Sequence, residues 1–312
     1  MMEFFKEFNL INSNENYIVF KGSNVYEKNL NDDSISLVYQ SDNDNCVSIN
    51  IKKDINIKVI YFDDCESDCS FVYNIDENIN ASITNIISNF CVNSKHYIEY
   101  NVRENAILNV CDFESVKSEL DELNNYYIHK NASLNLNNLR INDSSVSSLF
   151  NIYLLDRRAS CVLNNSVINS SSFDQKYNFV IHHLKAYTKS ELITYGVSKN
   201  NSVLNLDTNG IIKKNASKSE MFQKTKGIIL DLESVVSASP LLEIDEFDCM
   251  ASHGASIGAI DEGDLFYLMS RGLSREMSQS LIINGFFNPY LSKLNDAALF
   301  QYIQSVIKDH IA

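Results

Sequence analysis

Short apolar strand patterns recur through residues 21–257, and no long helical pattern separates them. Segments that begin at residues 104, 130, 158 and 199 share one layout: a polar pair or turn, a small residue, and then a short strand of alternating apolar residues. Repetition at intervals of about 20 to 50 residues is typical of stacked supersecondary units. Because helices are missing between the strands, a βαβ sheet is disfavoured. A solenoid of parallel strands fits best, and a β-sandwich is the structural alternative.

The turns between these strands must form largely without glycine. The chain has nine glycines, none of them between Gly22 and Gly196, and no proline before Pro240. It contains 40 asparagines. Asparagine is the non-glycine residue best suited to left-handed backbone positions, and its side chain forms local turns. We therefore predict that asparagine supplies the turns, although mutational drift in an A/T-rich genome would also enrich it.

The chain divides into three parts. Residues 1–20 predict a short N-terminal helical segment with phenylalanines on its apolar side. Residues 21–257 form the strand-rich core, which is the body of the expected solenoid. Residues 258–312 have helical periodicity instead and predict a C-terminal helical segment.

Three helices are expected in the C-terminal segment. The first covers 261–271, with Asp261 as its cap. The second opens at Ser274 and stops at Gly285, and the third runs roughly over 291–309. So short a segment exposes its apolar side chains unless it packs on the body or on a partner.

Composition excludes several classes of function. The net charge is −14, which disfavours sequence-independent binding of nucleic acid. No run of about 18 apolar residues predicts a membrane span, and the N-terminus lacks the features of a secretion signal. We therefore expect a cytoplasmic protein. Seven irregularly spaced cysteines predict free thiols, and the Cys65–Cys69 pair lacks a second pair at zinc-finger spacing.

One C-terminal stretch carries a specific resemblance. Residues 252–274 are SHGASIGAIDEGDLFYLMSRGLS. This stretch resembles the signature of the SufB/SufD family of the SUF iron–sulfur cluster assembly machinery, which runs SHGAT-x-G, then DE, then LFYL-x-SRG. Ser256 replaces the threonine. Weaker matches precede it in the family's order, at 182–183, 188–192, 196–197, 209–216, 223–231 and 240–244.

The resemblance implies a fold and partners. Members of this family are right-handed parallel β-helices with flanking helical segments, and their C-terminal helices dock on SufC, an ABC-type ATPase. Their partners include a SufB-type paralogue and, indirectly, a cysteine desulfurase system. The residues that we predict to bind the ATPase are Asp261, Leu265, Phe266, Tyr267, Arg271 and Phe286. The chain itself has no GxxxxGK[ST] loop and should not hydrolyse ATP.

The resemblance also implies a candidate ligand. His253 matches the histidine that SufD is thought to contribute at the interface with SufB, and Gly254 favours a SufD-like member because SufB scaffolds usually carry glutamate there. The alternative for His253 is a buried histidine with a structural role. Cys249 is a second candidate for iron or a transient cluster, with a packed thiol as its alternative. On an extended strand the two residues share a face but lie about 13 Å apart.

The sequence thus predicts a non-catalytic subunit of the SUF complex that pairs with a SufB-type partner or with itself. No tightly bound cofactor is expected. The acidic residues of 243–248 could attract iron, but solvation of an edge strand is the simpler role. The alternative class of function is a β-helix enzyme that acts on polysaccharides, which would need acids and bases along one solenoid face.

Overall fold

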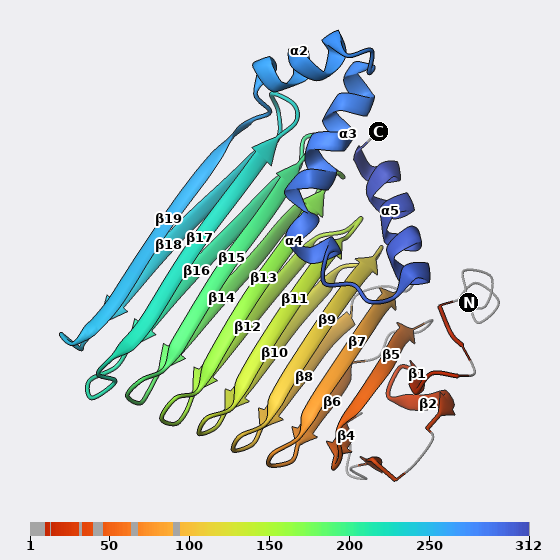
Figure 1. Cartoon of the computed structure of the whole chain (residues 1–312). Coiled ribbons are helices and arrows are strands. Elements are labelled where there is room, and N and C mark those ends of the chain that lie inside the picture. Colours follow the sequence, from red (N-terminus) through yellow and green to blue (C-terminus); the bar gives the residue numbers. More distant parts are fainter. Residues whose placement is uncertain are drawn as a thin grey trace.

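The protein is a parallel β-solenoid, as the computed structural model shows (Figure 1). The structure describes residues 10–12, 14–30, 33–39, 46–63, 68–89 and 94–311. Successive strands of the core alternate between two sheets, so each coil contributes one strand to each. This arrangement confirms the solenoid and is not a β-sandwich.

The first sheet, sheet A, contains strands from alternate positions along the chain. Its strands are β1 (Tyr17–Lys21), β2 (Asn24–Asn29), β5 (Ile55–Asp63), β7 (Asn80–Asn89), β9 (Ile107–Val116), β11 (Ser133–Ile141), β13 (Ser160–Asn169), β15 (Lys189–Ser198), β17 (Ser219–Ile229) and β19 (Cys249–Ala259). Neighbouring strands from β5 to β19 are parallel, whereas β2 pairs antiparallel with β1 at the N-terminal end. Parallel pairing requires a crossover, which here is the strand of the other sheet.

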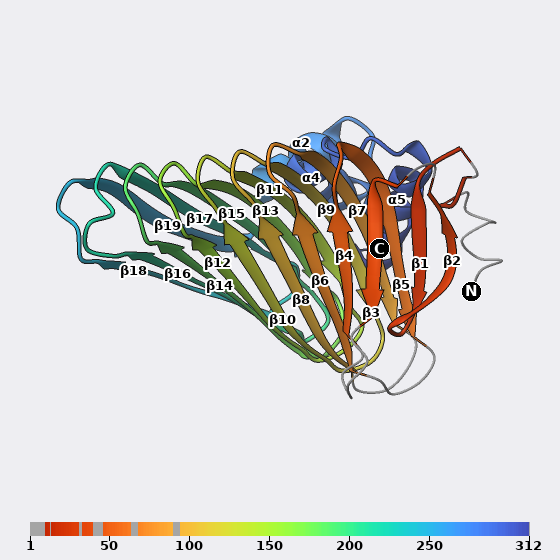
Figure 2. The same ribbon diagram turned by 90° about the horizontal axis from the view of Figure 1, so that it is seen from below.

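The second sheet, sheet B, completes each coil. Its strands are β3 (Ile35–Tyr39), β4 (Cys46–Ile51), β6 (Cys69–Ile75), β8 (Ser94–Val102), β10 (Leu120–Ile128), β12 (Val146–Leu154), β14 (Asp174–His183), β16 (Val203–Ile212) and β18 (Val235–Ile244). Figure 2 shows the coils end to end, with β18 and β19 at one end and β1 to β3 at the other.

Alternation of side chains along each strand creates the core. In β12 every second residue is buried between the sheets, and the residues between them face outward. Aromatic rings stack from coil to coil inside: Tyr73 on Tyr100 at 4.6 Å, and Tyr100 on Tyr126 at 5.0 Å. Burial of such side chains contributes roughly 25 cal/mol per Å² of apolar surface, so the stacked coils stabilise one another.

Asparagine supplies most of the left-handed turns, as predicted. The non-glycine residues with positive φ include six asparagines: Asn78, Asn105, Asn131, Asn200, Asn201 and Asn215. Some of these turns also align between coils. Asn131 Nδ2 donates to Asn105 Oδ1 at 3.0 Å, and Asn105 Nδ2 donates to Asn78 Oδ1 at 3.1 Å. The asparagine excess therefore has a structural use in place of glycine.

The C-terminal helices follow the solenoid and cover one of its faces. They are α2 (Glu262–Ser270), α3 (Arg275–Phe286), α4 (Asn288–Leu291) and α5 (Ala297–Ile311). Ile283, Phe287 and Tyr290 pack against outward-facing residues of sheet A such as Leu139 and Ile168. Figure 1 shows α3, α4 and α5 along this sheet, whereas α2 lies beyond the end of β19. The last helix starts at Ala297, later than the expected residue 291. Residues 288–291 form the separate short helix α4, and Asp296 caps α5 by accepting a hydrogen bond from the backbone N–H of Leu299 at 2.9 Å.

Lys58 links the N-terminal segment and the connection between α4 and α5 to sheet A. Its side chain is buried, and Nζ pairs with Asp296 at 2.6 Å and with Glu15 at 3.0 Å. Of the N-terminal segment expected to be helical, residues 1–9 lie outside the described residues, and Tyr17 to Phe20 belong to strand β1.

Candidate functional site

The solenoid ends in two strands that lack an outer neighbour. β19 pairs with β17 over its whole length, and β18 pairs with β16, but neither meets a further strand in the part of the chain that the structure describes. We call β18 and β19 the distal edge. β18 contains Pro240, which edge strands tolerate, whereas β19 has 11 residues and no proline. The free backbone N–H and C=O groups along the outer edge of a strand of this length can pair with a strand of another chain.

His253 lies near the middle of this edge. Its Cα partner on β17 is Gln223, and its side chain is exposed. It borders a groove of about 390 Å³ whose other lining residues include Phe222, Lys224 and Ser256. The exposed position rules out the alternative of a buried structural histidine and leaves the imidazole free to meet a group from another molecule.

Cys249 lies at the start of the same strand and is partly buried. Its thiol donates to the carbonyl oxygen of Glu246 at 3.1 Å. Burial raises the pKa of the Cys249 thiol, and the charges of Glu246 and Asp248 raise it further. The thiolate that binds soft metals is therefore disfavoured in the isolated chain.

The described part of one chain does not assemble a complete metal site. Among the described residues, no three His, Cys, Asp or Glu side chains lie close enough together to hold a metal ion. His182 and His183 lie on opposite faces of β14, His182 partly buried and His183 buried. The buried His183 has both ring nitrogens at 2.8 Å from hydroxyls, those of Thr188 and Ser190, and burial lowers its pKa to about 4. Its role is structural.

The helices beyond the distal edge expose apolar side chains. Phe266 is 75% exposed and Tyr267 is 57% exposed, both on α2. Arg271 lies over the ring of Tyr267, with 5.2 Å between its guanidinium carbon and the ring centre. Met277 and Leu281 of α3 are also exposed, although neither was among the residues predicted to bind a partner. Their spacing of four residues on one helix face was the available signal.

Three residues predicted to bind a partner also have structural roles. Leu265 is only 1% exposed, so it lies on the buried side of α2 and is not available to a partner. Phe286 packs edge-on against Tyr195 of β15, with 4.9 Å between the ring centres. The carboxylate of Asp261 caps α2 by accepting hydrogen bonds from the backbone N–H groups of Gly263 and Asp264. Leu265 must therefore be removed from the candidate surface.

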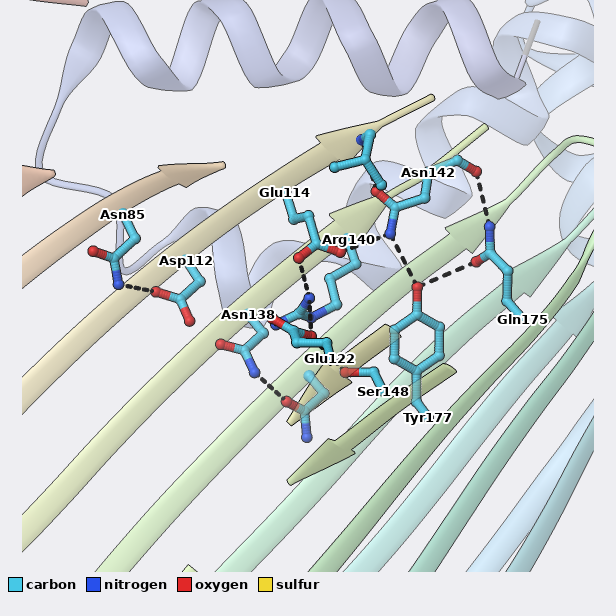
Figure 3. A network of polar contacts seen from close by, with 12 residues as sticks. Asn85, Asp112, Glu114, Glu122, Asn138, Arg140, Asn142, Ser148, Gln175 and Tyr177 are labelled. Carbon is cyan, nitrogen blue, oxygen red and sulfur yellow. Dashed lines mark hydrogen bonds and ion pairs between the residues drawn. The ribbon is translucent and has the colours of Figure 1, made fainter. Parts of the chain in front are cut away.

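A polar cluster lies inside the solenoid, where the alternation of apolar residues predicts an apolar core (Figure 3). Arg140 of β11 is buried and pairs through Nη1 with Glu114 of β9 and, at 2.9 Å, with Glu122 of β10. Asp112 of β9 is buried beside them and accepts from Asn85 Nδ2 at 2.7 Å. The alternation within β11 places Arg140 on the inward side of its strand. Its pairing with Glu114 depends on the register between β9 and β11.

These features define a β-solenoid protein with an open end and a helical cover. Comparison with known proteins identifies the family: the model for "SUF system FeS cluster assembly, SufBD core domain" matches residues 69–286. The chain belongs to this family.

Individual relatives support the same assignment. The chain is 34% identical over 129 residues to the iron–sulfur cluster assembly protein SufD of Bacillus subtilis, a match that covers 41% of this chain and 29% of that protein. It is 33% identical over 97 residues to SufD of Escherichia coli, covering 30% of this chain and 23% of that protein. A SufBD family protein of Archaeoglobus fulgidus is 34% identical over 110 residues, or 35% of this chain and 29% of that protein. The matches thus span less than a third of these relatives.

No helix in the described ranges is long and apolar enough to cross a membrane.

Proposed function

We propose that this chain is a SufD-like, non-catalytic subunit of a cytoplasmic complex that assembles iron–sulfur clusters. It pairs through the distal edge with a second solenoid, either a SufB-type protein or another copy of itself, and it binds a SufC-type ABC ATPase through its C-terminal helices. The observation that carries this proposal is the open outer edge of strand β19, which meets no further strand among the described residues, with the exposed His253 at its middle. The family match favours assembly over the alternative of a polysaccharide enzyme.

The cluster in this proposal is cargo. Imidazole and thiolate are both ligands that hold iron–sulfur clusters. Because His253 belongs to no group of three or more potential metal ligands within the described part of its own chain, a cluster bound there would need groups from the second solenoid. A site divided between two subunits can release a finished cluster when the subunits separate.

Replacing His253 with alanine should lower cluster formation by the reconstituted complex without changing its assembly. Loss of even an outer-shell partner of a metal ligand typically costs about 10- to 100-fold, so we expect a fall of about tenfold or more. The measurement is the visible absorbance of the cluster formed with iron and sulfide donors. His129→Ala, in the turn between β10 and β11 of an earlier coil, is the control. Equal yields from both variants would exclude His253 as a ligand.

Introducing charge at Phe266 and Tyr267 should abolish co-purification of the ATPase. Exposed aromatic side chains that become buried on binding typically contribute about 2 kcal/mol or more each, and a buried unpaired carboxylate adds a desolvation penalty. Pull-down with Phe266→Glu/Tyr267→Glu tests this, with Gln304→Glu on the exposed side of α5 as the control. Retention of the ATPase by the double variant would mean that α2 is not its docking site.

A further inference from the structure

A row of stacked turns connects each strand of sheet B to the next strand of sheet A, and three consecutive turns of this row are basic. The turns 155–158, 184–188 and 213–218 together contain six Lys or Arg residues and one acid. Figure 1 shows the row along the lower edge of the solenoid, away from α2. A local excess of positive charge in a chain with a net charge of −14 marks this edge as different from the rest of the surface.

The turns of this row share one left-handed position, and the basic turns fill it in an unusual way. At this position the residue has a positive φ, and its backbone N–H donates to a carbonyl group of the next turn. The six residues related in this way are Asn78, Asn105, Asn131, Arg158, Tyr187 and Lys218. Asparagine adopts this conformation readily, whereas it is unfavourable for long side chains. Such conformations are typical of binding sites, where the side chain is needed for another purpose.

Most of the cations in the three basic turns have no acid beside them. Lys213 and Lys218 lie 3.9 Å and 2.9 Å from carboxylates of the turn 245–248. The other four are exposed and form no ion pair with any described residue; they are Arg157, Arg158, Lys185 and Lys214. Tyr187 lies among them and is 40% exposed, and the guanidinium carbon of Arg157 is 4.4 Å from its ring centre. We call these four cations and Tyr187 the basic ridge.

The length of the basic ridge limits what it can bind. It spans three coils, and neighbouring strands lie about 4.8 Å apart, so its cations are spread over roughly 10 Å. On one side the turn 245–248 carries three acids, and on the other Lys130 is already paired with Glu104 at 2.6 Å. A nucleic-acid duplex would extend beyond the ridge over these turns and be repelled by the acids. An extended peptide advances about 3.3 Å per residue, so three or four acidic residues match the ridge.

We propose that the basic ridge binds an acidic, extended segment of another protein, at a surface separate from the distal edge and from α2. The carboxylates of the segment pair with the four free cations, and the arginines can hold a carboxylate through two parallel hydrogen bonds. Stacking on Tyr187 limits the orientations of the Arg157 guanidinium and so favours this geometry. The inference does not depend on the proposed pairing with a second solenoid or on binding of the ATPase.

A short acidic peptide serves as a probe of defined chemistry. The probe is a fluorescein-labelled peptide with alternating Asp and Glu between terminal glycines, and its binding to the full chain is measured by fluorescence anisotropy at low ionic strength. Replacing Arg157, Lys185 and Lys214 together with glutamine should weaken binding about tenfold or more. The matched control Lys95→Gln, Lys117→Gln and Lys308→Gln removes three cations from exposed positions elsewhere and should bind as wild type does. Equal affinities of these two variants would overturn the inference.

Arg158→Asn separates binding from folding. It introduces the residue type that three earlier turns have at this position, and asparagine tolerates a positive φ better than arginine does. The variant should therefore unfold in urea at the same or a higher midpoint than wild type, yet bind the acidic peptide about twofold or more weakly. Unchanged peptide binding would show that Arg158 serves no ligand. Equal binding of a peptide with Asn and Gln in place of the acids, or tighter binding of a DNA duplex, would also overturn the inference.

Discussion

Replacing Arg140 with methionine should destabilise the folded chain by about 3 to 5 kcal/mol, the usual cost of removing one partner from a buried ion pair. Arg140 is 2% exposed and its guanidinium lies 4.9 Å from the centre of the Phe150 ring. Burial lowers the pKa of Arg140, but the carboxylates of Glu114 and Glu122 outweigh burial and raise it. Removing the guanidinium would leave both carboxylates buried without a cation in the described interior of the solenoid.

Neutral partners provide the control for this prediction. In the triple variant Arg140→Met, Glu114→Gln and Glu122→Gln no buried charge of the triad remains, and most of the lost stability should return, because replacing a whole buried ion cluster is often nearly neutral. Unfolding in urea can be followed by circular dichroism, and tyrosine fluorescence serves as a second probe because the chain has no tryptophan. A loss below about 1 kcal/mol for Arg140→Met would show that the triad contributes little.

The architecture could be predicted from the sequence because the sequence patterns that indicate it are local. Alternation of apolar residues within each strand, turns formed by asparagine, and caps such as Asp261 depend on neighbours within a few residues. The helical segment was recognised for the same reason, although Leu265 and Phe286 could not be distinguished from Phe266. Which side of a helix packs on the body depends on where the preceding strand ends, and that is set by contacts across the whole solenoid.

The interior polar cluster and the open end could not be predicted in the same way. Asp112 and Asn138 are adjacent because β9 and β11 pair in one register. A slip of one residue in either strand would turn that strand's member of the pair to the outer face. Likewise, the exposure of His253 follows from β19 being the last strand of sheet A. Resemblance to a family singled out His253, but only the position of the strand shows that another molecule can reach it.

The largest pH effect is expected at Asp112. Burial raises the pKa of its carboxyl to about 7, although Arg140 and Asn85 lower it. The neighbouring Asn138 Oδ1 has no hydrogen-bond donor among the described residues. Protonated Asp112 can donate to it and still accept from Asn85, as an asparagine would at this position. The row Asn85, Asp112, Asn138 and Asn165 is thus an asparagine ladder in which one member is a carboxylic acid.

Asp112→Asn should therefore stabilise the protein at neutral and higher pH. Because the folded-state pKa lies above the unfolded value of about 4, protonation favours the folded state, and this contribution is complete below about pH 4 and lost as pH rises through 7. Wild type should lose stability relative to the variant by about 1.4 kcal/mol per pH unit between these values, or roughly 4 kcal/mol in total.

The measurement is the difference in unfolding free energy between Asp112→Asn and wild type from pH 5 to 8.5. This difference cancels the groups that both proteins share, and Asp121→Asn, an exposed carboxylate on β10, controls for the general loss of one negative charge. The difference should grow with pH up to about 7 and then level off. A constant difference across this range would show that Asp112 is already ionised in the folded protein, stabilised by Arg140, and that it does not substitute for an asparagine in the ladder.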